Sequence, residues 1–98
     1  MSSKHRNLLR QIYQDPTPGN IQWREIESLL RHLGADLQPG HGARFHVWLN
    51  RHESVLHHPH HGNTLGRQDV RHLREFLAAA GVTPSSYEEG AEASAQRD

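Results

Sequence analysis

The sequence predicts an α+β domain with a three-stranded antiparallel sheet and two helices on one face of it. Residues 23–33 and 67–80 have apolar side chains at the three- and four-residue spacing of amphipathic helices. Between them, residues 43–50 alternate apolar and polar side chains, which is the period of a half-buried strand. Helices that precede and follow the strands cover one face of the sheet, and the other face is left for solvent or a ligand.

The segment ahead of this domain, residues 1–20, predicts an extra N-terminal helix and a loop. Leu8, Leu9 and Ile12 share one side of the helix, and two prolines and a glycine at residues 15–20 end it. This short apolar stripe docks either on the domain or on a partner, and the sequence leaves both interpretations open.

Three strands follow the first amphipathic helix, which ends at Gly34. They are predicted at residues 35–38, 43–49 and 54–58, with a turn at residues 39–42 and a tight connection at residues 50–53. Pro59 ends the third strand because proline cannot donate a hydrogen bond to a sheet. On the central strand, Arg44, His46 and Trp48 alternate with apolar residues, so its polar face carries side chains capable of chemistry.

Composition indicates one cytoplasmic domain at residues 21–82, followed by a disordered acidic tail at residues 83–98. The chain has no cysteine, which excludes disulfides and thiolate chemistry. It has no apolar leader and no run of ~18 apolar residues, so we expect no membrane span. The formal net charge is zero, but the tail holds four acidic residues and one arginine, so the rest carries +3. Ten of the eleven basic residues are arginine, which fits phosphate binding and equally fits a codon preference.

Histidine is concentrated in the middle of the chain. Seven of the ten histidines lie between His41 and His61. Since the ordinary charge change of histidine lies nearest neutral pH, we expect proton transfer, metal binding or phosphate contact here. The run from His57 to His61 lacks ligands from a second element, so we expect no functional metal and no cofactor.

Four motifs, in order, resemble the HicA family of toxins. The helix that begins at Trp23 and ends Leu-Gly-Ala resembles the family's first helix, and Gly40-His-Gly-Ala-Arg44 resembles its Gly-Ser-His segment. His57-His-Pro-His60 is similar to its strand-end Pro-His motif, and residues 70–82 are similar to its last helix. The resemblance covers residues 21–82. It implies the α-β-β-β-α fold of a double-stranded-RNA-binding domain (dsRBD-like).

HicA proteins are toxins of toxin–antitoxin pairs. The resemblance therefore implies cleavage of messenger RNA (mRNA), a HicB-like antitoxin that covers the active surface, and a metal-independent mechanism carried by one histidine. The family's catalytic histidine follows Gly-Ser, and Arg44 stands at the matching position here. Arginine stays protonated in proteins and cannot act as a general base. Three interpretations are open: catalysis has moved to a neighbour, the protein binds RNA without cutting it, or the register differs by a residue or two.

The neighbours of Arg44 supply the groups that RNA cleavage needs. The reaction requires a base for the 2′-hydroxyl proton, an acid for the leaving 5′-oxygen, and positive charge near the phosphate. His46 shares a strand face with Arg44, and His58 or His60 is expected to reach the same region from the adjoining strand. We therefore expect His46 and His58 to be catalytic, with Arg44 stabilising the phosphorane. Alternatively, these histidines are half-buried polar residues of a sheet face.

Further RNA contacts are expected at His41, Trp48, His60, Arg67, Arg71 and Arg74. The three arginines share a face at the start of the last helix, where they would bind phosphates; otherwise they are solvated and partly paired to Asp69 or Glu75. Trp48 stacks on a base, anchors an antitoxin or packs under the N-terminal helix. The sequence thus predicts a ribonuclease toxin. The alternatives are a non-catalytic RNA-binding module on the same fold and an antitoxin-binding interaction domain.

Overall fold

A computed structural model describes residues 3–59 and 62–86 of the chain and confirms the predicted α+β architecture. The helices are α1 (Ser3–Ile12), α2 (Trp23–His32) and α3 (Arg67–Ala79), and the strands are β1 (Ile21–Gln22), β2 (Asp36–Pro39), β3 (Arg44–Leu49), β4 (His52–His57) and β5 (Thr64–Leu65). Strands β2, β3 and β4 form an antiparallel sheet in that order. In the described part of the chain, no helix has the length and hydropathy needed to cross a membrane.

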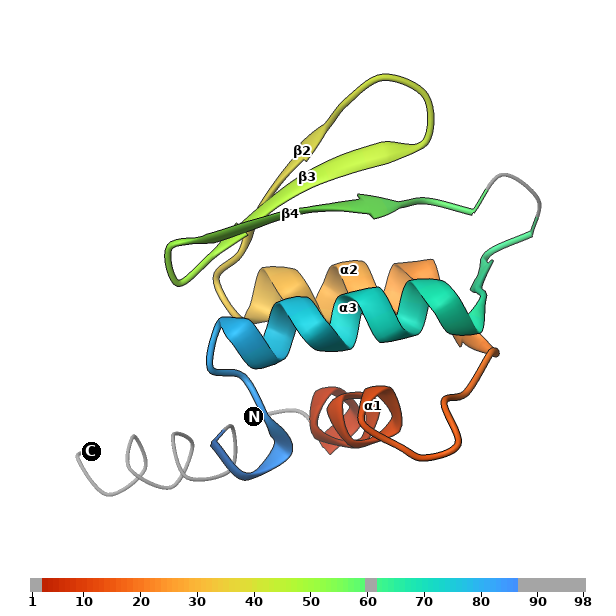
Figure 1. Cartoon of the computed structure of the whole chain (residues 1–98), viewed down its shortest axis with the longest axis vertical. Coiled ribbons are helices and arrows are strands. Elements are labelled where there is room, and N and C mark those ends of the chain that lie inside the picture. Colours follow the sequence, from red (N-terminus) through yellow and green to blue (C-terminus); the bar gives the residue numbers. More distant parts are fainter. Residues whose placement is uncertain (1–2, 60–61, 87–98) are drawn as a thin grey trace.

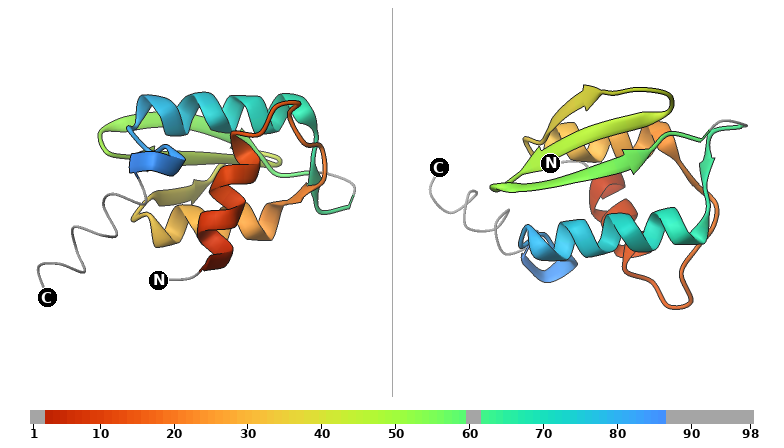
Figure 2. Two further views of the ribbon diagram at one scale, coloured as in Figure 1. Left: turned by 90° about the horizontal axis from the view of Figure 1, so that it is seen from below. Right: turned by 45° about the horizontal axis from the view of Figure 1, so that its top comes forward.

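The elements are stacked in three layers (Figure 1). The three-stranded sheet forms the first layer, and α2 and α3 lie side by side beneath it. Helix α1 crosses α2 and α3 on the side away from the sheet (Figure 2). One face of the sheet is therefore covered by helices, and no described element covers the other face (Figures 1 and 2).

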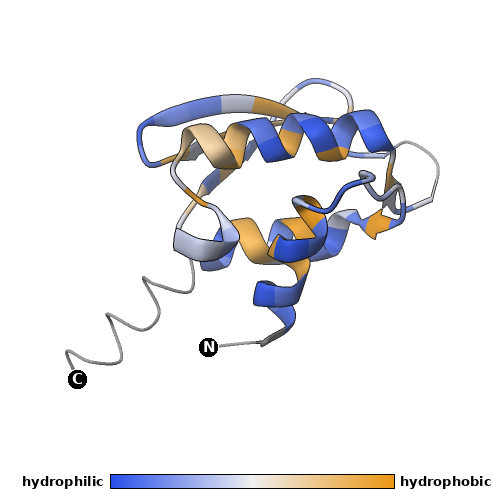
Figure 3. Ribbon diagram, turned by 60° about the horizontal axis from the view of Figure 1, so that its bottom comes forward, coloured by the Kyte–Doolittle hydropathy of each residue, from blue (hydrophilic) through white to orange (hydrophobic). Residues whose placement is uncertain are grey.

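The N-terminal helix contributes to the core of the domain. Leu8 is 4% exposed, and Leu9 and Ile12 are fully buried in the same cluster as the apolar residues of α2 and α3. Polar residues occupy the other positions of α1, as the colouring by hydropathy shows (Figure 3). Of the two interpretations of its apolar stripe, the structure thus selects docking on the domain.

Two side chains fasten α1 and its following loop to the rest of the chain. Arg74 donates from Nε to the carbonyl oxygen of Ile12 at 2.8 Å. It also donates from Nη2 to the carbonyl oxygen of Gln14 and to the buried hydroxyl of Thr17, both at 3.0 Å. The Tyr13 hydroxyl donates to the carbonyl oxygen of Val82 at 2.6 Å. Burial raises the pKa of Tyr13, which keeps this phenol protonated as the hydrogen-bond donor.

The β3–β4 connection is shorter than predicted, which sets the register of the hairpin. We predicted a connection at residues 50–53, and this was wrong because β4 already begins at His52. Asn50 and Arg51 form the turn with φ values of 50° and 70°. Two consecutive positive φ values are typical of two-residue hairpin turns. Asn50 also donates from Nδ2 to the carbonyl oxygen of Ala80 at 2.9 Å, so the turn is anchored at the end of α3.

A small ribbon of β1 and β5 joins the starts of the two core helices. Ile21 pairs with Leu65 and Gln22 with Thr64, and neither strand was predicted from the sequence. Strands of two residues are too short to show a period, so the sequence pattern could not reveal them. The tail was predicted as disordered from residue 83, and this was wrong for its start: residues 84–86 form a helical turn, and the backbone N–H of Thr83 donates to Ser86 Oγ at 2.8 Å. The rest of the tail, from residue 87 onward, lies outside the described residues.

Candidate functional site

The uncovered face of the sheet is lined by alternate residues of β2, β3 and β4. Phe45 is half-buried and Val47 and Leu49 are buried against the helices, so the residues between them point the opposite way. The pairing of the strands then places their neighbours on the same side. We call this surface the open face; it consists of Asp36, Gln38, Arg44, His46, Trp48, Glu53, Val55 and His57.

His46 lies at the centre of the open face. It pairs with Gln38 on β2 and with Val55 on β4, and its ring is half-buried. Gly40 leaves room for the imidazole, because a Cβ atom at Gly40 would lie 3.3 Å from His46 Cδ2. The rings of His46 and Trp48 are nearly parallel, at 20°, with centroids 5.9 Å apart. The imidazole thus lies between Gly40 and Trp48 and stays partly exposed.

The basic end of the open face consists of Arg44 and His57. The two residues are direct cross-strand partners. Since the next pair along is joined by a hydrogen bond from His58 N to Ala43 O (2.6 Å), Arg44 and His57 form a non-hydrogen-bonded pair. Side chains in such pairs start from Cβ atoms only about 4.5–5.5 Å apart. Both side chains are exposed, so this end presents the positive charge of Arg44 next to His46.

The acidic end of the open face surrounds Trp48. Its indole is 37% exposed, whereas the other large apolar side chains of the described residues are buried or half-buried. Asp36 on β2 and Glu53 on β4 pair with Trp48 from its two sides. Together with Gln38 and His46, these residues line a shallow hollow of about 680 Å³. The open face thus changes from basic to acidic along β3, with His46 between the two ends.

His58 lies on the opposite side of the sheet from His46, contrary to our expectation. Its ring packs against Trp23 (centroids 5.3 Å apart) and Phe45 (6.3 Å apart), and its Nδ1 lies 2.8 Å from the Pro59 carbonyl oxygen. The cause is the alternation of β4, because Leu56 is buried and His58 points the same way. The histidine that reaches the open face from β4 is His57, which our sequence reasoning missed.

The three arginines of α3 do not form one phosphate clamp. Arg74 is occupied by its hydrogen bonds to the end of α1 and the following loop. The side chain of Arg67 lies beside Gly19, in that same loop, and Arg67 and Arg71 are both exposed. A contribution of Arg67 or Arg71 to RNA binding stays a prediction.

The remaining predicted residues differ in how the structure places them. His41 is exposed in the turn that leads into Arg44, at the basic end. His60 lies outside the described residues. Trp48 is not packed under α1, because α2 and α3 lie between that helix and the sheet (Figure 1). Within residues 3–59 and 62–86, no three His, Asp or Glu side chains gather as a metal site would require.

The open face also contains residues that the sequence pattern did not single out. Asp36, Gln38 and Glu53 were missed because β2 and the start of β4 are too short or too polar to show a clear alternation. The position of Glu53 follows from the two-residue turn, which fixes every pair of the β3–β4 hairpin, whereas Asp36 and Gln38 are placed by the pairing of β2 with β3. If the turn had been assigned to Asn50 and Arg51 alone, the alternation of β4 would have predicted that Glu53 and His57 lie on the open face.

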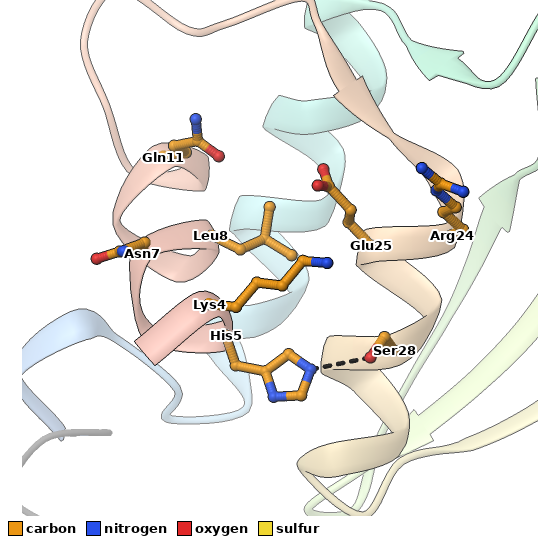
Figure 4. A pocket seen from close by; sticks show the side chains of 8 residues that line it. All are labelled: Lys4, His5, Asn7, Leu8, Gln11, Arg24, Glu25 and Ser28. Carbon is orange, nitrogen blue, oxygen red and sulfur yellow. Dashed lines mark hydrogen bonds between the residues drawn. The ribbon is translucent and has the colours of Figure 1, made fainter. Parts of the chain in front are cut away.

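A second cavity, of about 560 Å³, lies between α1 and α2 on the other side of the molecule (Figure 4). His5 points across it, and its Nε2 lies 2.9 Å from the Ser28 hydroxyl. The remaining lining residues are Lys4, Asn7, Leu8, Gln11, Arg24 and Glu25. Although this cavity is more enclosed than the hollow at Trp48, none of its lining residues was selected as a site residue by the sequence, and α2 and α3 separate α1 from the sheet (Figure 1). We therefore take the open face as the candidate site.

Comparison with known proteins identifies the family. A family model described as "HicA toxin of bacterial toxin-antitoxin" matches residues 23–82, which is more than half of the 98 residues. No curated protein and no solved structure matches the chain. The match runs from the start of α2 through the sheet to the end of α3, so it contains the whole open face. The chain therefore belongs to the HicA family, the toxins of bacterial toxin–antitoxin systems.

Proposed function

We propose that this toxin is a metal-independent endoribonuclease that cleaves mRNA in the cytoplasm on the open face. The observation that supports the proposal is the placement of His46 beside the Arg44–His57 pair on an uncovered sheet face. A HicB-like antitoxin would silence the toxin by covering the same face. No cofactor enters the proposed reaction.

The proposed reaction is an attack of the ribose 2′-oxygen on the adjacent phosphorus. His46 accepts the 2′-hydroxyl proton while the new phosphorus–oxygen bond forms. His57 donates a proton to the 5′-oxygen as its bond to phosphorus breaks, which gives a 2′,3′-cyclic phosphate and a free 5′-hydroxyl. Arg44 stabilises the negative charge that develops on the phosphorane. His57 takes the role that we predicted for His58.

The spacing of Arg44, His46 and His57 suits these three catalytic roles. His57 is the cross-strand partner of Arg44 and a diagonal neighbour of His46. Diagonal neighbours lie about 7–8 Å apart, within reach of long side chains, so one phosphate can lie between the two imidazoles. Because His46 is half-buried and its ring lies beside that of Trp48, it is the better positioned of the two.

The test is to induce the full chain and its His46→Ala variant in cells and to follow growth and transcript ends. We expect wild type to arrest growth and produce fragments with 5′-hydroxyl ends, and His46→Ala to lose about 10²–10⁴-fold in cleavage. His52→Ala is the matched control, since His52 is an exposed histidine on the same hairpin, next to the turn. Unchanged toxicity of His46→Ala would remove His46 from the mechanism.

A non-catalytic RNA-binding module is the second candidate, and Arg44 is the observation that favours it. Arg44 occupies the place of the histidine that the HicA resemblance implies, and arginine cannot exchange a proton. For this alternative we expect normal growth, intact transcripts and RNA that stays bound during purification. Normal growth without bound RNA would indicate an antitoxin-binding interaction domain instead.

A further inference from the structure

We propose that the acidic end of the open face binds a guanine base of the RNA and thereby gives the toxin a sequence preference. The base would stack on Trp48, and Asp36 and Gln38 would form hydrogen bonds with its Watson–Crick edge. The inference rests on the proposed RNA-cleaving function and adds a substrate preference to it. We call the four residues Asp36, Gln38, Trp48 and Glu53 the Trp48 subsite.

An exposed tryptophan on a sheet is a typical platform for an unpaired base. Trp48 is 37% exposed and forms part of the hollow, whereas the other tryptophan, Trp23, is 4% exposed in the core. Proteins that recognise single-stranded RNA commonly stack its bases on such aromatic side chains. The nearly parallel ring of His46 lies beside the indole, so the catalytic group and the platform are immediate neighbours.

The order of the side chains along β3 matches the order of groups in a nucleotide. Arg44, His46 and Trp48 follow one another on the same face, each step being about 6.6–6.8 Å in a strand. A phosphate at Arg44 and a ribose at His46 therefore leave the attached base near Trp48. The two carboxylates that flank Trp48 repel phosphate and favour this orientation of the RNA over the reverse.

Asp36 and Gln38 supply hydrogen-bonding groups in the order that guanine requires. They are two residues apart on β2, on one face, and Gln38 Nε2 donates to Asp36 Oδ1 at 3.4 Å. This long bond places an amide donor beside a carboxylate acceptor, and it is weak enough to exchange for a ligand. Guanine presents an acceptor, O6, beside two donors, N1–H and the N2 amino group. The amide of Gln38 can therefore donate to O6 while the carboxylate of Asp36 accepts from both donors.

The other three bases fit this arrangement less well. Adenine and cytosine each place a ring-nitrogen acceptor beside their amino group, and uracil has a carbonyl oxygen on each side of its N3–H. A carboxylate cannot donate to these acceptors, and burying two acceptors against each other is unfavourable. Glu53, on the opposite side of Trp48 from Asp36, adds to the negative charge that keeps phosphate away from this end.

The test measures binding of the full chain to labelled pentanucleotides that differ only in the central base. Each has the form UUNUU with 2′-O-methyl riboses, which block cleavage, and N is guanine, adenine, cytosine, uracil or hypoxanthine. We expect the guanine probe to bind about tenfold more tightly than the uracil probe, as a bidentate base contact provides. The affinity for the hypoxanthine probe, which lacks only the amino group, should lie between the affinities for the guanine and uracil probes. Fluorescence anisotropy gives each affinity.

Asp36→Asn should reduce the guanine preference to about twofold or less, because an amide cannot accept both donors. Glu75→Gln is the control, since Glu75 is an exposed carboxylate on α3, and it should keep the preference. Thermal unfolding checks that both variants are folded.

Equal affinities for all bases in wild type, or a preference that survives in Asp36→Asn, would overturn the inference and leave the RNA function standing. Failure of every probe to bind would overturn both. Binding of an arginine-rich peptide in place of RNA, dependent on Asp36, would assign the subsite to a protein partner and also overturn it.

Discussion

The Arg74 guanidinium on α3 donates from Nε to the carbonyl oxygen of Ile12, the last residue of α1, at 2.8 Å. The same side chain also reaches the buried hydroxyl of Thr17. This arginine, which the sequence pattern assigned to RNA, therefore fastens the N-terminal segment to the domain.

Substitution of Arg74 is expected to lower stability and leave RNA affinity nearly unchanged. Arg74→Ala removes hydrogen bonds from a charged donor and leaves Thr17 without its partner, so the free energy of unfolding should fall by about 1.5–3 kcal/mol. Arg71→Ala, at an exposed position of the same helix, should change it by at most about 0.5 kcal/mol. Urea denaturation followed by circular dichroism measures both. Equal effects of the two substitutions would contradict the tethering role.

Truncation of Leu9 should show that α1 is part of the core. Leu9 is fully buried between α1 and the other helices, so Leu9→Ala should cost about 2–5 kcal/mol of unfolding free energy. Asn7→Ala, at an exposed position of α1, should cost far less. Both are measured by thermal and urea unfolding. If Leu9→Ala were as stable as wild type, α1 would not be a core element.

Enlargement of Gly40 should impair catalysis while the fold persists. The new methyl group of Gly40→Ala would lie 3.3 Å from His46 Cδ2, so the imidazole must shift. Displacements of about 1 Å at a catalytic group can cost ~10²-fold in rate, so a shift of a few tenths of an ångström should slow RNA cleavage roughly two- to fivefold. Gly66→Ala is the control, because the nearest atom to its methyl group would be Asp69 Oδ2 at 4.0 Å. Cleavage rates per folded protein, equal for both variants, would argue against His46.

Acidification should weaken the attachment of α1 through His5. The His5 ring stacks on His32 with centroids 4.6 Å apart, and its Nδ1 is buried without a hydrogen-bond partner in the described structure. Burial, followed by the charges of His32 and Lys4, lowers the pKa of His5 from 6.5. The unfolded chain therefore binds the proton more readily, and stability is lost as pH falls through 6.5 toward the lower folded-state value.

The measurement compares wild type with His5→Gln between pH 7.5 and pH 5.5. The histidines that do not contact His5 are common to both proteins, so their contributions cancel in the difference of unfolding free energies, which reports His5 together with its neighbour His32. Wild type should lose more stability on acidification than His5→Gln. A parallel loss in the two proteins would show that His5 does not sense pH.

The sequence by itself determined the helices, the central strand and the family. The spacing of Trp23, Ile26, Leu29 and Leu30 predicted a buried helix face, and all four are buried. The alternation from Phe45 to Leu49 predicted which side of β3 faces the helices, and therefore placed Arg44, His46 and Trp48 on the open face. These features are periodic, and a period of two or of about 3.6 residues can be read from the chain alone.

Only the tertiary structure decided which residues meet His46. The two-residue turn at Asn50 and Arg51 sets the register of β4, and that register brings His57 to the open face and turns His58 toward Trp23. Likewise, a helical wheel places Arg74 on the exposed side of α3, but in the structure its guanidinium is hydrogen-bonded to Ile12 at the end of α1. Register and the docking of distant segments depend on contacts between residues far apart in the chain, which no local period records.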